Sequence, residues 1–192
     1  MLTLQKQSTN IPAALFATYI QKEGIKLSAS DKLELVEKTQ LFELALDARR
    51  FDAIEAFVTD DFIYDHALAY REGKKAHTEF WEASQAVLLD GIRHQPVNII
   101  VYGEADGTAT SVSYLNVLKF ADTPELPASD NPLLIAHGIR VMNFRKENGV
   151  WKLARLTIDQ MAVSQAFPID DTTRRYFAAT AGERDQIRQP LF

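Results

Sequence analysis

The chain has 192 residues, 46% of them hydrophobic and 24% charged, which is enough for one buried core and argues against a second domain. Its formal net charge is -5 and no run of Lys or Arg exceeds two residues, so we expect no nucleic-acid partner. The absence of cysteine excludes disulfides, thiolate metal sites and a cysteine nucleophile.

The N-terminal part contains an apolar segment that is too short to span a membrane. Residues 11–20 supply roughly ten apolar positions, against the ~20 that a membrane helix needs. No convincing small-residue cleavage site of a signal peptide follows. We therefore expect a cytoplasmic protein with no membrane partner. Residues 1–29 are expected to form an arm with one short helix over 12–22.

A long helix, two further helices and one strand are expected next. Residues 28–31 give a capping-type start to a helix over 30–49. A short helix over 52–58 follows, then a strand over 62–66. Gly73 opens a third helix, over 74–89, in which apolar residues recur at helical spacing.

From His94 onward the period of the apolar residues changes to two, which is typical of strands. The expected strands cover residues 97–102, 108–120, 133–146 and 150–159. Hairpin turns are expected at 104–107 and at Asn148-Gly149, and the proline-containing segment 121–132 is expected to be a polar loop. The domain then covers 30–162, and 163–192 form a C-terminal tail.

Helices followed by an antiparallel meander define the α+β class. We expect a cone-shaped α+β barrel, with three N-terminal helices packed against a strongly curved, mostly antiparallel sheet. Such a sheet, bent around the long helix, would leave a conical pocket open at one end.

Asp47 is the most informative residue, because a carboxylate here has little structural reason to exist. Helical spacing places it on one stripe with Leu33, Val36, Gln40 and Leu44. Burial and the negative end of the helix dipole would both oppose ionisation, as in many acid–base catalysts. The simpler alternative is an exposed Asp47 that pairs with Arg50, worth about 0–1 kcal/mol.

Strand alternation extends the candidate site. If His94 points inward, Asn98 should follow it on the same face. On the next strands we assign Tyr114, Asn116 and Arg140 to the inside. An inward Arg140 could bind an oxyanion or a carboxylate and would counter the charge of Asp47.

Several other residues have a structural as well as a functional interpretation. We assign Tyr64, His66 and Trp81 to the pocket wall, although helical aromatic residues are more often core. His77 is expected on a polar helix face, and His137 on the outer face of the sheet. His66, His94 and Asp47 lack the spacing of a dedicated metal site, so we expect no metal and no other cofactor.

Three segments together resemble the SnoaL-like branch of the nuclear-transport-factor-2-like superfamily, which includes scytalone dehydratase, polyketide cyclases and relatives of ketosteroid isomerase. They are residues 46–52, 73–76 and 149–153. The resemblance implies that Asp47, at the end of the first helix, pairs with His94 as an acid–base dyad. It also implies a Tyr on the first strand, where this chain has His66 with Tyr64 nearby. The family's second His is replaced by Leu118.

The residues and the resemblance together favour a cofactor-independent dehydratase, isomerase or cyclase that acts on a small, largely apolar carbonyl compound. Two alternatives remain open. One is a structural β subunit of a ring-hydroxylating dioxygenase, and the other is a non-catalytic small-molecule-binding protein of the same fold. The resemblance further implies a homodimer through the outer sheet face, with which apolar residues there agree: Ile135, Ile139 and Val141.

Overall fold

The computed structural model describes residues 24–121, 126, 132–165, 167, 171 and 174–175. The expected helix over 12–22, most of the loop over 121–132 and most of the C-terminal tail lie outside the described residues. Within the described ranges, no helix combines the length and the apolar composition that crossing a bilayer would require.

The helices that pack against the sheet are α2 (Ala29–Asp47), α3 (Phe51–Phe57) and α4 (Lys74–Leu88). They match the helices predicted over 30–49, 52–58 and 74–89. A capping box fixes the start of α2, because the Ser28 hydroxyl accepts the Asp31 N–H at 3.0 Å and the Asp31 carboxylate accepts the Ser28 N–H at 3.2 Å.

The strands form one six-stranded mixed sheet in the order β2-β1-β6-β5-β4-β3. Their bounds are β1 (Val58–His66), β2 (Ala69–Glu72), β3 (Ile92–Gly103), β4 (Ala109–Lys119), β5 (Leu133–Glu147) and β6 (Val150–Val163). The β1–β6 pair is parallel and the other pairs are antiparallel. The α+β class is confirmed, but the sheet is not closed into a barrel, since β2 and β3 are its edges. β2 was not predicted, and β1 begins earlier than expected.

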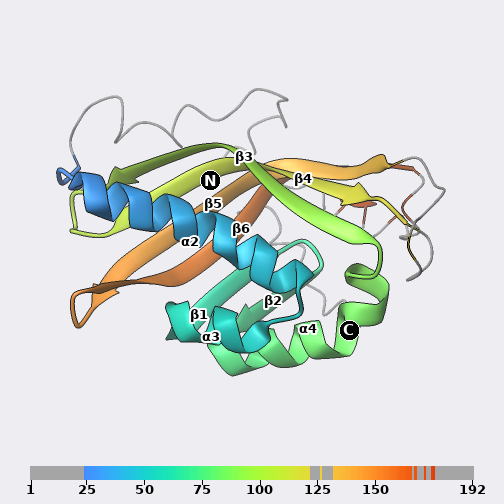
Figure 1. Ribbon diagram of the computed structural model, residues 1–192, viewed down its shortest axis with the longest axis horizontal. Coiled ribbons are helices and arrows are strands. Elements are labelled where there is room, and N and C mark those ends of the chain that lie inside the picture. The colour runs from blue at the N-terminus through green and yellow to red at the C-terminus, as the bar shows by residue number, and fades with distance from the viewer. Residues whose placement is uncertain are drawn as a thin grey trace, which may run out of the picture.

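Helix α2 crosses one face of the sheet formed by β3–β6, whereas α3 and α4 gather beside β1 and β2 (Figure 1). Trp151 joins α2 to the last hairpin, because its buried indole donates through Nε1 to Asp31 Oδ1 at 2.7 Å. Trp151 thereby fixes the start of the long helix against the last hairpin.

The buried face of α2 differs from the stripe expected from the sequence. It carries Leu35, Thr39, Phe42, Glu43 and Leu46, whereas Leu33, Gln40 and Leu44 are exposed. Asp47 nevertheless points inward, because Thr39, Glu43 and Asp47 follow one another at steps of four residues along the side of α2 that faces the sheet. Asp47 therefore points inward as predicted, but the residues that share its side of α2 are Thr39 and Glu43 and not the predicted stripe.

Candidate functional site

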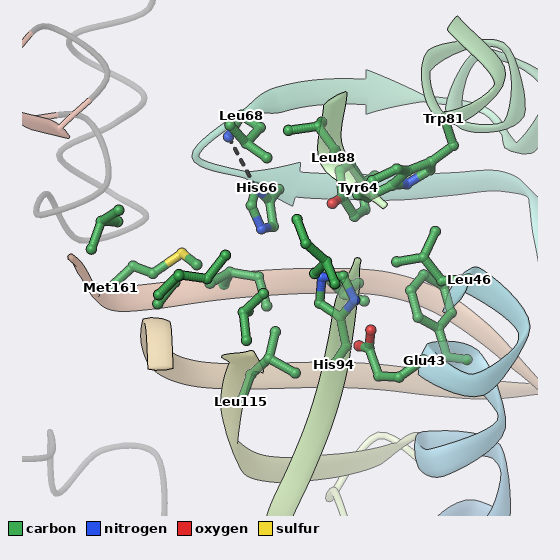
Figure 2. Close-up of a pocket in the computed structure, with 18 of the residues that line it drawn as sticks. Glu43, Leu46, Tyr64, His66, Leu68, Trp81, Leu88, His94, Leu115 and Met161 are labelled. Carbon is green, nitrogen blue, oxygen red and sulfur yellow. Dashed lines mark hydrogen bonds between the residues drawn. The ribbon is translucent and has the colours of Figure 1, made fainter. Parts of the chain in front are cut away.

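A pocket lies between α2, α4, β1 and the inner face of the sheet. It contains about 570 Å³ of space not filled by atoms, its open mouth included. The wall is mostly apolar, with contributions from Phe42, Leu46, Leu115, Val117, Ile158 and Met161. Among the described residues, polar side chains reach it at Glu43, Tyr64, His66, Trp81 and His94 (Figure 2). Such a wall suits an apolar molecule with few polar groups.

The structure brings Asp47 and His94 together. Asp47 Oδ1 lies 2.7 Å from His94 Nδ1, and Asp47 Oδ2 accepts the backbone N–H of His94 at 2.9 Å. The side chains are 8% and 10% exposed, respectively. The two bonds tie the end of α2 to the start of β3, and they offset the burial of the carboxylate at a helix C-terminus.

The arrangement of this pair exposes one ring nitrogen for chemistry. His94 lines the pocket, whereas Asp47 lies behind the ring. Because the carboxylate accepts at Nδ1, the neutral ring carries its proton on Nδ1 and leaves Nε2 unprotonated. The alternative of a surface pair between Asp47 and Arg50 is wrong, since Arg50 donates to Asp52 at 2.8 and 2.7 Å.

A second buried carboxylate, which was not predicted from the sequence, lies one helical turn before Asp47. Glu43 is 3% exposed and lines the pocket. Its Oε1 accepts from Nη1 of Arg140, which is 0% exposed, and Nη2 of Arg140 donates to the Thr39 carbonyl at 3.1 Å. Burial lowers the pKa of Arg140 below its ordinary value, and the neighbouring Glu43 counters this shift.

Arg140 points inward as predicted, but its partner is different. The guanidinium pairs with Glu43 instead of countering Asp47, and it is not part of the pocket wall. Its Nε and the Ser113 hydroxyl have no hydrogen-bond partner within the described residues. The sequence contained one signal of this ion pair. An inward Arg between Ile139 and Val141 on an apolar strand is buried, and a buried guanidinium needs an acidic partner.

The β1 side of the pocket carries Tyr64 and His66. Their rings are stacked, with centroids 5.4 Å apart and an interplanar angle of 3°. His66 Nδ1 accepts the Leu68 N–H at 2.9 Å, which turns the other ring nitrogen away from Leu68. Burial, and then the charge of Glu43, raise the pKa of Tyr64 well above 10.0, so its hydroxyl stays neutral and can donate.

Trp81 closes the pocket beside Tyr64, with ring centroids 6.0 Å apart. Its Nε1 donates to His77 Nε2 at 3.0 Å. The expectation of a polar helix face for His77 is wrong, since this ring is buried among the aromatic residues of the core. Burial lowers the pKa of His77 to about 3, so the ring is a neutral acceptor.

Three predicted pocket residues lie elsewhere. Asn98 is exposed in a bulge between Val97 and Ile100, where its φ of 54° reverses the side-chain alternation of β3. Tyr114 packs with the outer-face cluster of Tyr102, Val112 and Ile139. Asn116 Oδ1 bonds to His137 Nδ1 at 2.8 Å.

On β4 the two faces are therefore reversed relative to the prediction. Leu115 and Val117 line the pocket, while Tyr114 and Asn116 contact His137, whose expected outward position is confirmed. Ile135 was also misplaced, because it lines the pocket and not the outer face. A homodimer through that face stays a prediction. No set of three His, Asp or Glu side chains converges as a metal site in the described ranges.

The comparisons with known proteins identify the family. The SnoaL-like domain family matches residues 28–157. No curated protein matches the chain. A solved protein of unknown function with a cystatin-like fold from Nostoc punctiforme is 28% identical, with a TM-score of 0.61 over 75% of this chain and 98% of that one.

Two further solved structures, both from Novosphingobium aromaticivorans, share the fold. One, described as a putative aromatic ring hydroxylase, is 19% identical, with a TM-score of 0.59 over 72% of this chain and 96% of that one. The other, described as a putative scytalone dehydratase, is 14% identical, with a TM-score of 0.52 over 69% and 87%. Because the family match extends over most of the described domain, the chain belongs to the SnoaL-like domain family.

Proposed function

We propose that the protein is a cofactor-independent acid–base enzyme, a dehydratase, isomerase or cyclase, that acts on a small, largely apolar carbonyl compound. The observation that carries the proposal is the 2.7 Å contact between Asp47 Oδ1 and His94 Nδ1 at the wall of an apolar pocket. Membership of the SnoaL-like family and the similarity in fold to a putative scytalone dehydratase support the same class of reaction.

His94 would act as the general base. Its Nε2 takes a proton from the carbon next to the carbonyl, and the electrons of the broken C–H bond move to the carbonyl oxygen to form an enolate. In a dehydration, the enolate re-forms the carbonyl and expels the hydroxyl on the next carbon, which leaves as water with the proton from His94. In an isomerisation, the proton returns to another carbon. Asp47 orients the ring and stabilises the imidazolium between the two steps.

The most direct test follows proton abstraction without requiring the natural substrate. A panel of aryl and alicyclic ketones, including 1-tetralone and 2-decalone, would be incubated with the protein in D2O, and the loss of α-proton signals followed by NMR. The wild type should accelerate exchange for part of the panel, and His94→Gln should slow it by about 10²–10⁴-fold. His137→Gln, on the outer face, is the matched control and should behave as wild type. Equal exchange in wild type and His94→Gln would reject the proposal.

A binding protein without catalysis is the second candidate. One observation favours it. Arg140 is engaged by Glu43, so the pocket wall has no cationic side chain among the described residues to stabilise an enolate oxygen. Thermal stabilisation by ketones without any exchange would support this candidate. A structural subunit of a dioxygenase would instead be shown by co-purification with an iron–sulfur partner.

A further inference from the structure

We propose that Glu43 is a second polar contact for the bound molecule, and that it selects neutral hydroxylated compounds by accepting a hydrogen bond from a substrate hydroxyl. The inference rests on the proposed function in one respect, namely that this pocket is the substrate site. It concerns binding and makes no use of proton transfer by His94. The substrate class that the inference implies is a carbonyl compound with a free hydroxyl and no carboxylate.

The geometry of Glu43 leaves one oxygen available. Oε1 accepts from Arg140, whereas no described residue donates a hydrogen bond to Oε2. The side chain lines the pocket although it is 3% exposed, and Figure 2 shows its carboxylate pointing from α2 into the space where His94 also lies. An ionised carboxylate only accepts hydrogen bonds, so its complement on a ligand is a donor. Leaving Oε2 unpaired beneath an apolar ligand would be unfavourable.

Charge decides which kind of donor fits. Arg140 already compensates the charge of Glu43, so a cationic ligand would add an unpaired charge to an apolar pocket. A ligand carboxylate would face Oε2, with no cationic side chain among the described wall residues to pair with it. A neutral hydroxyl satisfies Oε2 without either cost.

Tyr64 is the competing explanation for a preference for hydroxyl groups, because it also lines the pocket. A neutral phenol both donates and accepts, so it would bind a methoxy or a carbonyl oxygen as readily as a hydroxyl. Glu43 cannot do so. A ligand pair that differs only by hydroxyl and methoxy therefore separates the two residues.

The test uses 2-naphthol, 2-methoxynaphthalene and 2-naphthoate as probes, with binding to the full chain measured by the change in tryptophan fluorescence. On the wild type, 2-naphthol should bind roughly tenfold or more tightly than 2-methoxynaphthalene, as expected for a hydrogen bond to a charged group. Binding of 2-naphthoate should be weaker still. Glu43→Gln combined with Arg140→Met removes both charges, and the preference should fall below about threefold. Glu37→Gln, on the exposed side of α2, should keep it.

Several results would overturn the inference. They are equal affinity of the wild type for the hydroxyl and methoxy probes, failure of 2-naphthol to bind, or a preference that survives in the double variant. The wild-type comparison needs no variant to fold. Ketone exchange and the hydroxyl preference are measured separately on the wild type, so the absence of exchange with the preference intact separates failure of the proposed function from failure of this inference.

Discussion

Glu43 and Asp47 lie one turn apart on α2, and each carboxylate takes its own partner from a different strand, Arg140 on β5 and His94 on β3. Two like charges at this spacing would repel each other along the helix. The separate partners offset that repulsion and give the two acids different surroundings. Glu43 pairs with a buried guanidinium, whereas Asp47 pairs with an imidazole, a group that can gain and lose a proton.

The buried pair predicts a stability effect that depends on both charges. Glu43→Gln should lower the free energy of unfolding by about 3–5 kcal/mol, because the Arg140 guanidinium is left buried without its counter-ion. The double variant Glu43→Gln/Arg140→Met should lose clearly less. Urea denaturation of the three proteins measures this. A double variant that loses as much as Glu43→Gln, or more, would show that the pair is not coupled.

The contact at His94 Nδ1 predicts a single neutral tautomer. In wild type, ¹⁵N NMR should show the proton of the neutral His94 ring on Nδ1, since Asp47 Oδ1 accepts it at 2.7 Å. Asp47→Asn should produce a mixture of tautomers, because an amide can donate to Nδ1 as well as accept from it. An Nε2–H tautomer in wild type would contradict the geometry of the proposed base.

The buried, neutral ring of His77 should make the stability of the protein depend on pH. Its folded pKa of about 3 lies below its ordinary value of 6.5, so the unfolded state binds the additional proton. The contribution is complete above pH 6.5 and is lost as the pH falls from 6.5 toward 3. Between pH 6.5 and 5, wild type should lose up to about 1.4 kcal/mol of unfolding free energy per pH unit more than His77→Gln. Parallel slopes for the two proteins in urea titrations would rule this out.

The close packing around Gly91, just before the strand β3 that carries His94, leaves no room for a larger side chain at this position. A Cβ at this position would lie 2.0 Å from the Ala121 carbonyl oxygen, at a φ of +65°. Gly107, at φ +89°, has no atom within 4 Å of its Cβ position and is the matched control. Gly107→Ala should cost about 1–2 kcal/mol from backbone strain alone. Gly91→Ala should cost about 1–3 kcal/mol more, because a backbone carbonyl must move. Thermal unfolding of both variants decides this, and equal melting temperatures would mean that the close contact is absent.

The helices and hairpins could be predicted because their chemistry is local. The capping box at Ser28 and Asp31 marks the start of α2, and Asn148-Gly149 marks the last hairpin. The edge strand β2 could not be predicted, since four residues are too few to show an alternating pattern. The parallel pairing of β1 with β6 depends on tertiary packing between segments far apart in the chain.

The site was predicted only in part, for reasons visible in particular residues. On β4, Tyr114 and Asn116 alternate with Leu115 and Val117, and the prediction assigned the polar pair to the inside, whereas the pocket wall is mostly apolar. The bulge at Asn98 shifted the parity of β3 after His94. Glu43 was missed because a mid-helix glutamate is normally solvated, and its partner Arg140 lies on a distant strand.

Asp47 and His94 are proposed to act as one unit, and a double-mutant cycle on ketone α-proton exchange measures whether they do. Asp47→Asn, His94→Gln and the combined variant would be compared with wild type on the same ketone in D2O. If the two residues work together, each single variant slows exchange by about 10²–10⁴-fold, and the combined variant is no slower than His94→Gln alone. Multiplied losses in the combined variant, or wild-type exchange in Asp47→Asn, would show that the two residues act independently.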